Sequence, residues 1–262
     1  MQKRSEKTFS DLVKIIAKLR SKDGCPWDRA QTHLTLLPYL IEEAYEVLDC
    51  VEAKDYQKFK EELGDLLLQI IFHSQIARER KRFDINDVIL VLTQKLKQRH
   101  PHVFKNKKKL TPQQVINNWE HIKIKTENRL VLSGLPKHLP ALLKGYRVGE
   151  KVARFGFDWD KAGDIFEKIE EELNELKEVF LSRKDKKKKL TEQEMGDILF
   201  CLVNLSRHLK INPELALRKT IQKFVKRFNY IEKQLSQKGK PLHKATLKEM
   251  DLLWEEAKRK KI

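Results

Sequence analysis

Two pairs of acidic residues in the second half of the chain have the spacing of metal ligands on neighbouring helices. Glu172 and Glu175 are three residues apart, and Glu194 and Asp197 have the same spacing in the next helical segment. Side chains three or four positions apart lie on one face of an α-helix, so Glu171 also lies beside Glu175. If the two helices pair, these carboxylates converge on one site.

The segment that carries Glu194 and Asp197 is otherwise apolar, so its acids are poor candidates for ordinary surface residues. Converging carboxylates repel one another, and burial disfavours their charged form, so a cation is needed to hold them together. A small cluster of oxygen ligands suits Mg²⁺, with Mn²⁺ as a substitute, and does not suit zinc. Because Mg²⁺ shares its ligand shell with phosphates, the pattern predicts a site for a phosphate-bearing substrate.

The first half of the chain contains a second set of acids with the same spacing. This set is Glu43, Glu46, Glu62 and Asp65. Three further landmarks recur in the same order, about 130 residues apart. They are Trp27-Asp28 with Trp159-Asp160, Lys95 and Arg99 with Lys223 and Arg227, and Trp119-Glu120 with Trp254-Glu255. The order indicates an internal duplication, and the N-terminal acids are a second candidate metal site.

Apolar residues recur at helical spacing along almost the whole chain, and strand-like alternation is nearly absent. We expect an all-α protein with two tandem helical-bundle domains, residues 1–129 and 140–262, joined by a linker at 130–139. The expected helices are 9–19, 36–51, 56–80, 84–99, 111–127, 160–181, 191–209, 213–237 and 246–260. Asp84 is a plausible N-cap, and Thr191 with Glu194 has the spacing of a capping box at a helix start.

The chain of 262 residues is strongly basic, with a formal net charge of +17. Much of this charge lies in short lysine-rich runs, which are typical of solvated loops. The runs contain no interleaved aromatic residues for base stacking, so we expect no nucleic-acid partner. A basic surface also attracts small polyanions such as triphosphates.

The composition also bears on the compartment. No apolar run is long enough to span a membrane, and no apolar segment of a signal peptide follows the charged N-terminus. The three cysteines are far apart in the sequence, and their pattern fits neither a disulfide framework nor a zinc finger. We therefore expect a cytoplasmic protein without contact to a membrane.

Later in the second half, Lys223 and Arg227 lie four residues apart on one helix face. They are either donors to a triphosphate or ordinary surface charges. Trp254 either stacks on a base or packs in the core, and the sequence favours packing. We interpret Trp27 and Trp159 as loop-to-helix packing corners, with a role in substrate binding left open.

The chain resembles the MazG family of bacterial nucleoside triphosphate pyrophosphohydrolases over nearly its whole length. The matching segments are Gly24-Cys25-Pro26-Trp27-Asp28, Glu42-Glu43-x-x-Glu46, Glu62-Leu63-Gly64-Asp65, Arg99-His100-Pro101-His102-Val103-Phe104, Gly156-Phe157-Asp158-Trp159-Asp160 and Glu194-Met195-Gly196-Asp197. The resemblance implies an all-α homodimer with two such domains. It also implies Mg²⁺-dependent conversion of a broad set of ribo- and deoxyribonucleoside triphosphates to monophosphates and pyrophosphate.

The resemblance further implies that the C-terminal copy carries the activity. The implied metal ligands are Glu172, Glu175, Glu194 and Asp197, and the implied catalytic carboxylates are Glu171, Glu172 and Glu175. The implied nucleotide contacts are Lys168, Ile169, Glu170, Glu171, Glu172, Leu190, Thr191, Glu192, Gln193, Asp197, Lys223, Phe224, Val225, Lys226, Arg227 and Trp254.

Two functions from different classes remain open at this point. In the first, a metal-activated water attacks the α-phosphorus, pyrophosphate leaves, and one carboxylate of the Glu171 to Glu175 group orients the water. A narrower substrate, such as dUTP or a phosphoribosyl nucleotide, belongs to the same class. In the second, the chain is a basic module that binds nucleic acid or a regulatory partner and carries vestigial acid clusters. The intact acid sets favour the enzyme.

Overall fold

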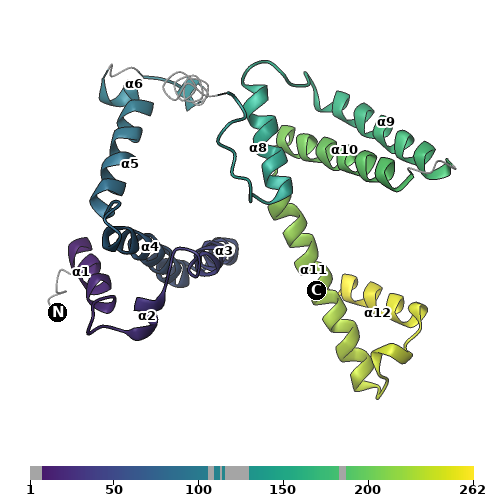
Figure 1. The fold of residues 1–262 in the computed structure, drawn as a ribbon. Coiled ribbons are helices and arrows are strands. Elements are labelled where there is room, and N and C mark those ends of the chain that lie inside the picture. Colours follow the sequence, from purple (N-terminus) through teal and green to yellow (C-terminus); the bar gives the residue numbers. More distant parts are fainter. Residues whose placement is uncertain (1–7, 106–108, 113, 116–129, 183–186) are drawn as a thin grey trace. The chain divides into compact units, whose positions relative to one another are not determined.

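The computed structural model describes residues 8–105, 109–112, 114–115, 130–182 and 187–262 (Figure 1). This part of the chain contains α-helices and one short 3₁₀ helix and no strand, which confirms the all-α fold. The chain divides into two compact units, residues 1–110 and 111–262. The tandem-domain boundaries expected from the sequence stay a prediction, because the expected border at residue 129 ends a stretch outside the described residues.

The first unit is built around a helical hairpin. Its helices are α1 (Phe9–Leu19), α2 (Pro26–Ala30), α3 (Leu37–Ala53), α4 (Tyr56–Glu79), α5 (Ile85–Arg99) and α6 (Pro101–Phe104). Lys54, in the left-handed region at φ 56°, ends α3, and the Asp55 side chain caps the start of α4. The two long helices therefore run antiparallel with only a two-residue connection between them (Figure 1).

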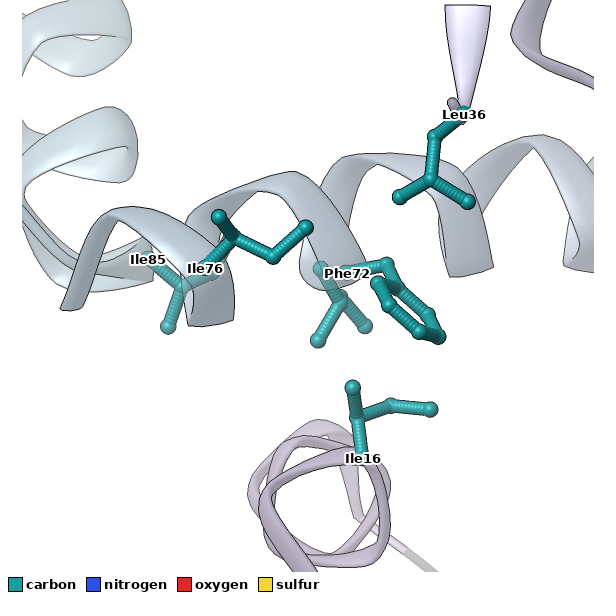
Figure 2. Close-up of a cluster of buried hydrophobic side chains, with 6 residues drawn as sticks. Ile16, Leu36, Phe72, Ile76 and Ile85 are labelled. Carbon is teal, nitrogen blue, oxygen red and sulfur yellow. The ribbon is translucent and has the colours of Figure 1, made fainter. Parts of the chain in front are cut away.

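A cluster of apolar side chains holds α1, α4 and α5 together in this unit. Ile16 of α1 and Ile85 of α5 meet Phe72 and Ile76 of α4, and Leu36 lies beside them just before α3 (Figure 2). These side chains are almost completely buried. Their burial fixes the face that α4 presents to α3, and the acids Glu62 and Asp65 belong to α4.

The second unit contains a matching hairpin. Its helices are α8 (Ala141–Ala153), α9 (Ala162–Leu181), α10 (Lys187–His208), α11 (Pro213–Gln237), η1 (Leu242–Lys244) and α12 (Leu247–Arg259). Helices α9 and α10 lie side by side, and α8 packs against α10 (Figure 1). Gly149 permits the close approach of α8, because a Cβ atom there would lie 2.5 Å from Oδ1 of Asn204. Helix α12 packs against α11 through Ile231, Leu235 and Leu253.

Most of the expected helices are confirmed to within two residues at either end. The expected start of a helix at Thr191 is wrong, since α10 already begins at Lys187. Thr191 lies inside this helix and its hydroxyl donates to the Lys187 carbonyl oxygen at 2.8 Å, so it forms no capping box with Glu194. Lysine has a high helix propensity, and the preceding lysine run extends the helix. Helices α2, α6 and α8 were not predicted from the sequence. Most of the helix expected at 111–127 lies outside the described residues.

No described helix combines the length and the apolar character needed to cross a bilayer. The cysteines Cys25, Cys50 and Cys201 are all free thiols, as expected. Burial raises the pKa of both Cys50 and Cys201, so these two thiols stay protonated at neutral pH.

Candidate active site

Each hairpin brings three carboxylates from two helices together. In the second unit these are Glu172 of α9 with Glu194 and Asp197 of α10, and one oxygen of each lies within 4.8 Å of the others. In the first unit Glu43 of α3 meets Glu62 and Asp65 of α4 with the same closeness. The side chains that converge in each unit are thus three of the four acids that the sequence singled out.

The fourth acid of each set lies next to the other three. Glu175 is exposed on α9 and shares a hydrogen bond with Glu194. Glu46 is half-buried on α3 and shares a hydrogen bond with Glu62. A hydrogen bond between two carboxyl groups requires one proton between them. This hydrogen bond is the largest cause of the raised pKa of Glu46, and it also raises the pKa of Glu194.

The electrostatics of the clusters reflect this crowding of negative charge. Desolvation raises the pKa of Glu194, and the charge and hydrogen bond of Glu175 and the charges of Asp197 and Glu172 raise it further. Desolvation also raises the pKa of Glu43, with Asp65 as the next largest cause. Both clusters therefore disfavour their own fully ionised state and would be stabilised by a cation.

A lysine supplies part of the missing positive charge in each unit. The ammonium of Lys168 lies 2.9 Å from both Glu171 and Glu172, and these contacts raise the pKa of Lys168. The ammonium of Lys58 lies 3.3 Å from Glu62, which likewise raises the pKa of Lys58. The carboxylates Glu62 and Glu172 are the buried acids of their clusters, and each is 6% exposed. Lys58 was not predicted from the sequence, although its spacing of four residues from Glu62 places the two side chains on one helix face.

The two other expected nucleotide-contacting segments on this hairpin flank the acid cluster. Ile169 and Glu170 lie on the same turns of α9 as Lys168, and the segment Leu190–Gln193 forms an early turn of α10. Leu190 and Thr191 are half-buried, whereas Glu192 and Gln193 are exposed. The start of α10 therefore offers polar side chains to solvent close to Glu194.

Three of the remaining expected nucleotide contacts, Lys223, Lys226 and Arg227, line a separate basic hollow between α11 and α12. This hollow has a volume of about 430 Å³ and is lined by Lys219, Gln222, Lys223, Lys226, Arg227, Lys258, Lys261 and Ile262. Phe224 and Val225 are exposed on the same helix. Helix α12 lies along the C-terminal half of α11, whereas α8 and α10 meet α11 near its start (Figure 1). Among the described residues, those that line the basic hollow include none of the acids of the cluster.

Trp254 packs at the edge of this hollow. Its ring lies 5.0 Å from the Phe224 ring and 5.5 Å from the Arg227 guanidinium, and it contacts the α11–α12 core. The Nε of Arg227 donates to the carbonyl oxygen of Ile262 at 2.9 Å. Of the N-terminal counterparts, Lys95 and Arg99 lie on α5, and Trp119 lies outside the described residues.

These features define an all-α protein in which helical hairpins gather carboxylates at their centre. Residues 31–104 match the family described as the MazG nucleotide pyrophosphohydrolase domain, and this segment contains all the acids of the first cluster. The chain is 46% identical over 253 residues to the nucleoside triphosphate pyrophosphohydrolase/pyrophosphatase MazG of Thermotoga maritima. The aligned residues cover 95% of this chain and 95% of the relative.

Two further relatives also match almost the whole length of this chain. It is 39% identical over 258 residues to the nucleoside triphosphate pyrophosphohydrolase of Escherichia coli K12, covering 96% of this chain and 97% of the relative. It is 44% identical over 253 residues to the uncharacterized protein YabN of Bacillus subtilis, covering 95% of this chain and 51% of YabN. The chain belongs to the MazG family.

Removal of one charge from the cluster is predicted to stabilise the metal-free protein. Because the pKa of Glu194 is raised, the folded protein binds this proton more tightly than the unfolded chain, and the ionised carboxylate costs stability above the folded pKa. Glu194→Gln should therefore raise the thermal unfolding midpoint at pH 8 in a chelator, and the gain should shrink as the pH falls toward 4.5, the ordinary pKa of a glutamate. Differential scanning calorimetry measures this, with the exposed Glu178→Gln of α9 as the control. A lower midpoint at pH 8 for Glu194→Gln than for the unchanged protein would contradict the repulsion.

Proposed function

We propose that this chain hydrolyses nucleoside triphosphates to nucleoside monophosphates and pyrophosphate at the α9–α10 hairpin. The observation that carries the proposal is the convergence of Glu172, Glu194 and Asp197 on one point. The relatives from Thermotoga maritima and Escherichia coli are named nucleoside triphosphate pyrophosphohydrolases, which supports the same reaction.

The donor set fits Mg²⁺ or Mn²⁺ as the cation of this site. The converging ligand atoms are all carboxylate oxygens, which hard divalent cations prefer. The raised pKa of Glu194 has the physical cause that such a cation relieves. In our proposal Glu172, Glu175, Glu194 and Asp197 hold Mg²⁺, which when bound lowers the pKa of a water and offsets charge on phosphoryl oxygens.

The protein's own side chains have distinct tasks in this proposal. Lys168 is held between Glu171 and Glu172, where its ammonium meets the phosphates of the substrate. One carboxylate among Glu171, Glu172 and Glu175 orients the attacking water and accepts its proton. Recognition through the triphosphate is independent of the base, so we propose a broad range of ribo- and deoxyribonucleotides as substrates. Such substrates are abundant in the cytoplasm, where we place the protein.

We further propose a homodimer in which the basic hollow of one copy faces the acid cluster of the other. This arrangement would bring Lys223, Arg227 and Trp254 to the triphosphate. Lys223 and Arg227 line the basic hollow, and Trp254 packs against Arg227. Large apolar side chains that are exposed on the helices concerned support such an association. They are Phe166, Leu173, Phe180, Leu181, Met195, Leu199, Phe200, Leu202, Leu217, Ile221, Phe224 and Val225.

Loss of the C-terminal acids is predicted to abolish turnover. Glu172→Ala, Glu175→Ala, Glu194→Ala and Asp197→Ala should each lower pyrophosphate release by more than about 100-fold, because each removes a ligand of the cation. A coupled pyrophosphate assay at saturating Mg²⁺ gives the rate.

The matched control uses the first unit. Glu43→Ala and Asp65→Ala make the same change in the N-terminal cluster and should leave most of the activity. Full activity in all four C-terminal variants, or loss of activity in the N-terminal variants alone, would refute the assignment to the α9–α10 hairpin.

Subunit mixing tests the shared site. Glu172→Ala and Arg227→Ala should each be inactive as homodimers. After refolding together at equal amounts they should regain about one quarter of the unmutated activity, because half of the dimers are mixed and each mixed dimer has one intact site. A mixture of Glu172→Ala with Asp197→Ala is the control and should stay inactive, since both changes lie in the same cluster. No recovery in the first mixture would place the acid and basic groups of one site in the same chain.

A further inference from the structure

A partly exposed ion pair joins the two chain segments at the open end of the α9–α10 hairpin. Nη1 of Arg207, near the end of α10, donates to Oδ2 of Asp158 at 2.8 Å, and Nη2 of Arg207 donates to Oδ1 of Asp158. His208 adds a contact, with its Nε2 3.0 Å from Oδ1 of Asp158. Asp158 lies four residues before Ala162, the first residue of α9. The pair therefore joins the segment entering α9 to the end of α10.

The guanidinium is also fixed from its other side. The Nε of Arg207 donates to Oδ1 of Asn204 at 3.4 Å, and Asn204 is almost fully buried. Gly149 of α8 leaves the space for this contact, because a Cβ atom there would lie 2.9 Å from Nε of Arg207. The side chain of Arg207 is only 10% exposed. The guanidinium of Arg207 is hydrogen-bonded through all three of its nitrogens. It therefore cannot move with Asp158 if the segment before α9 shifts.

We propose that Asp158 and Arg207 are positioning residues that set the axial register of α9 against α10, and with it the separation of Glu172 from Glu194 and Asp197. This inference rests on the proposed function of the α9–α10 hairpin. Neither side chain belongs to the acid cluster. They act through the two helices that carry the cluster.

The dimensions of an α-helix show how a small shift between α9 and α10 changes the distances between the acids. Arg207 and Asp197 are ten residues apart on α10, which corresponds to about 15 Å along the helix axis. A slip of one residue between α9 and α10 moves their side chains by about 1.5 Å relative to one another. Mg²⁺ requires its oxygen ligands at about 2.0–2.1 Å in near-ideal geometry, so such a slip separates ligands that must meet.

The first unit has a similar contact in the corresponding place. Arg20 at the end of α1 donates to both carboxylate oxygens of Glu79, at 2.9 and 2.7 Å, and Glu79 is the last residue of α4. Nη1 of Arg20 also donates to the carbonyl oxygens of Asp28, in α2, and of Gln31, at the end of α2. Here the long helix carries the acid and the preceding segment carries the cation, which is the reverse of the second unit. The first unit therefore offers a matched control.

The experiment measures Mn²⁺ binding to the nucleotide-free full chain by electron paramagnetic resonance of free Mn²⁺. An Asp65→Asn background is used throughout, so that binding reports on the C-terminal cluster. Asp158→Asn and Arg207→Lys keep the size or the charge of the side chain but lose the bidentate pair. Each should raise the dissociation constant for Mn²⁺ by about tenfold. The double variant should be no weaker than the weaker single variant, because both changes break one contact.

The control is Glu79→Gln, which breaks the pair of the first unit and should leave the dissociation constant unchanged. A lower unfolding temperature for Asp158→Asn and Arg207→Lys with an unchanged dissociation constant would overturn the positioning role. Glu172→Gln separates this failure from failure of the proposed site. If Glu172→Gln also leaves Mn²⁺ binding unchanged, the cluster itself is not the metal site.

Discussion

Mutual repulsion between carboxylates held on two paired helices is the constraint on which the rest of this structure depends. Helices α9 and α10 pack against each other, and both contribute carboxylates to one cluster. Desolvation raises the pKa of Glu194, and the charges of Glu175, Asp197 and Glu172 raise it further. Lys168 adds positive charge beside the acids. In our proposal, the pair of Asp158 and Arg207 holds the two helices in register against the repulsion.

The two hairpins meet this constraint with different residues. In the second unit the neutralising Lys168 lies on the first helix of the hairpin, and in the first unit Lys58 lies on the second. The ion pairs at the open ends also have opposite polarity, with Arg207 on the long helix in one unit and Glu79 in the other. The fold thus requires charge balance and a fixed register, and it tolerates more than one way of supplying them.

The sequence predicted the parts of this arrangement that depend on short spacings. Helical periodicity located most helices, and the spacing of Glu194 and Asp197 placed both on one face of α10. Helix α8 was missed because Gly145 and Gly149 weaken its helical pattern, and they are there to admit α10. The pair of Asp158 and Arg207 joins residues 49 positions apart, and no local pattern specifies such a contact. The location of the basic hollow could not be predicted from the sequence for the same reason, because it depends on how α12 packs against α11.

The central claim is that this chain directs water to the α-phosphorus of a nucleoside triphosphate. The most direct test is hydrolysis of a triphosphate with Mg²⁺ in ¹⁸O-labelled water, followed by mass spectrometry of the products. Our account predicts pyrophosphate and monophosphate in equal amounts, with the label in the monophosphate alone. Release of orthophosphate with a nucleoside diphosphate, or label found in the pyrophosphate, would contradict it.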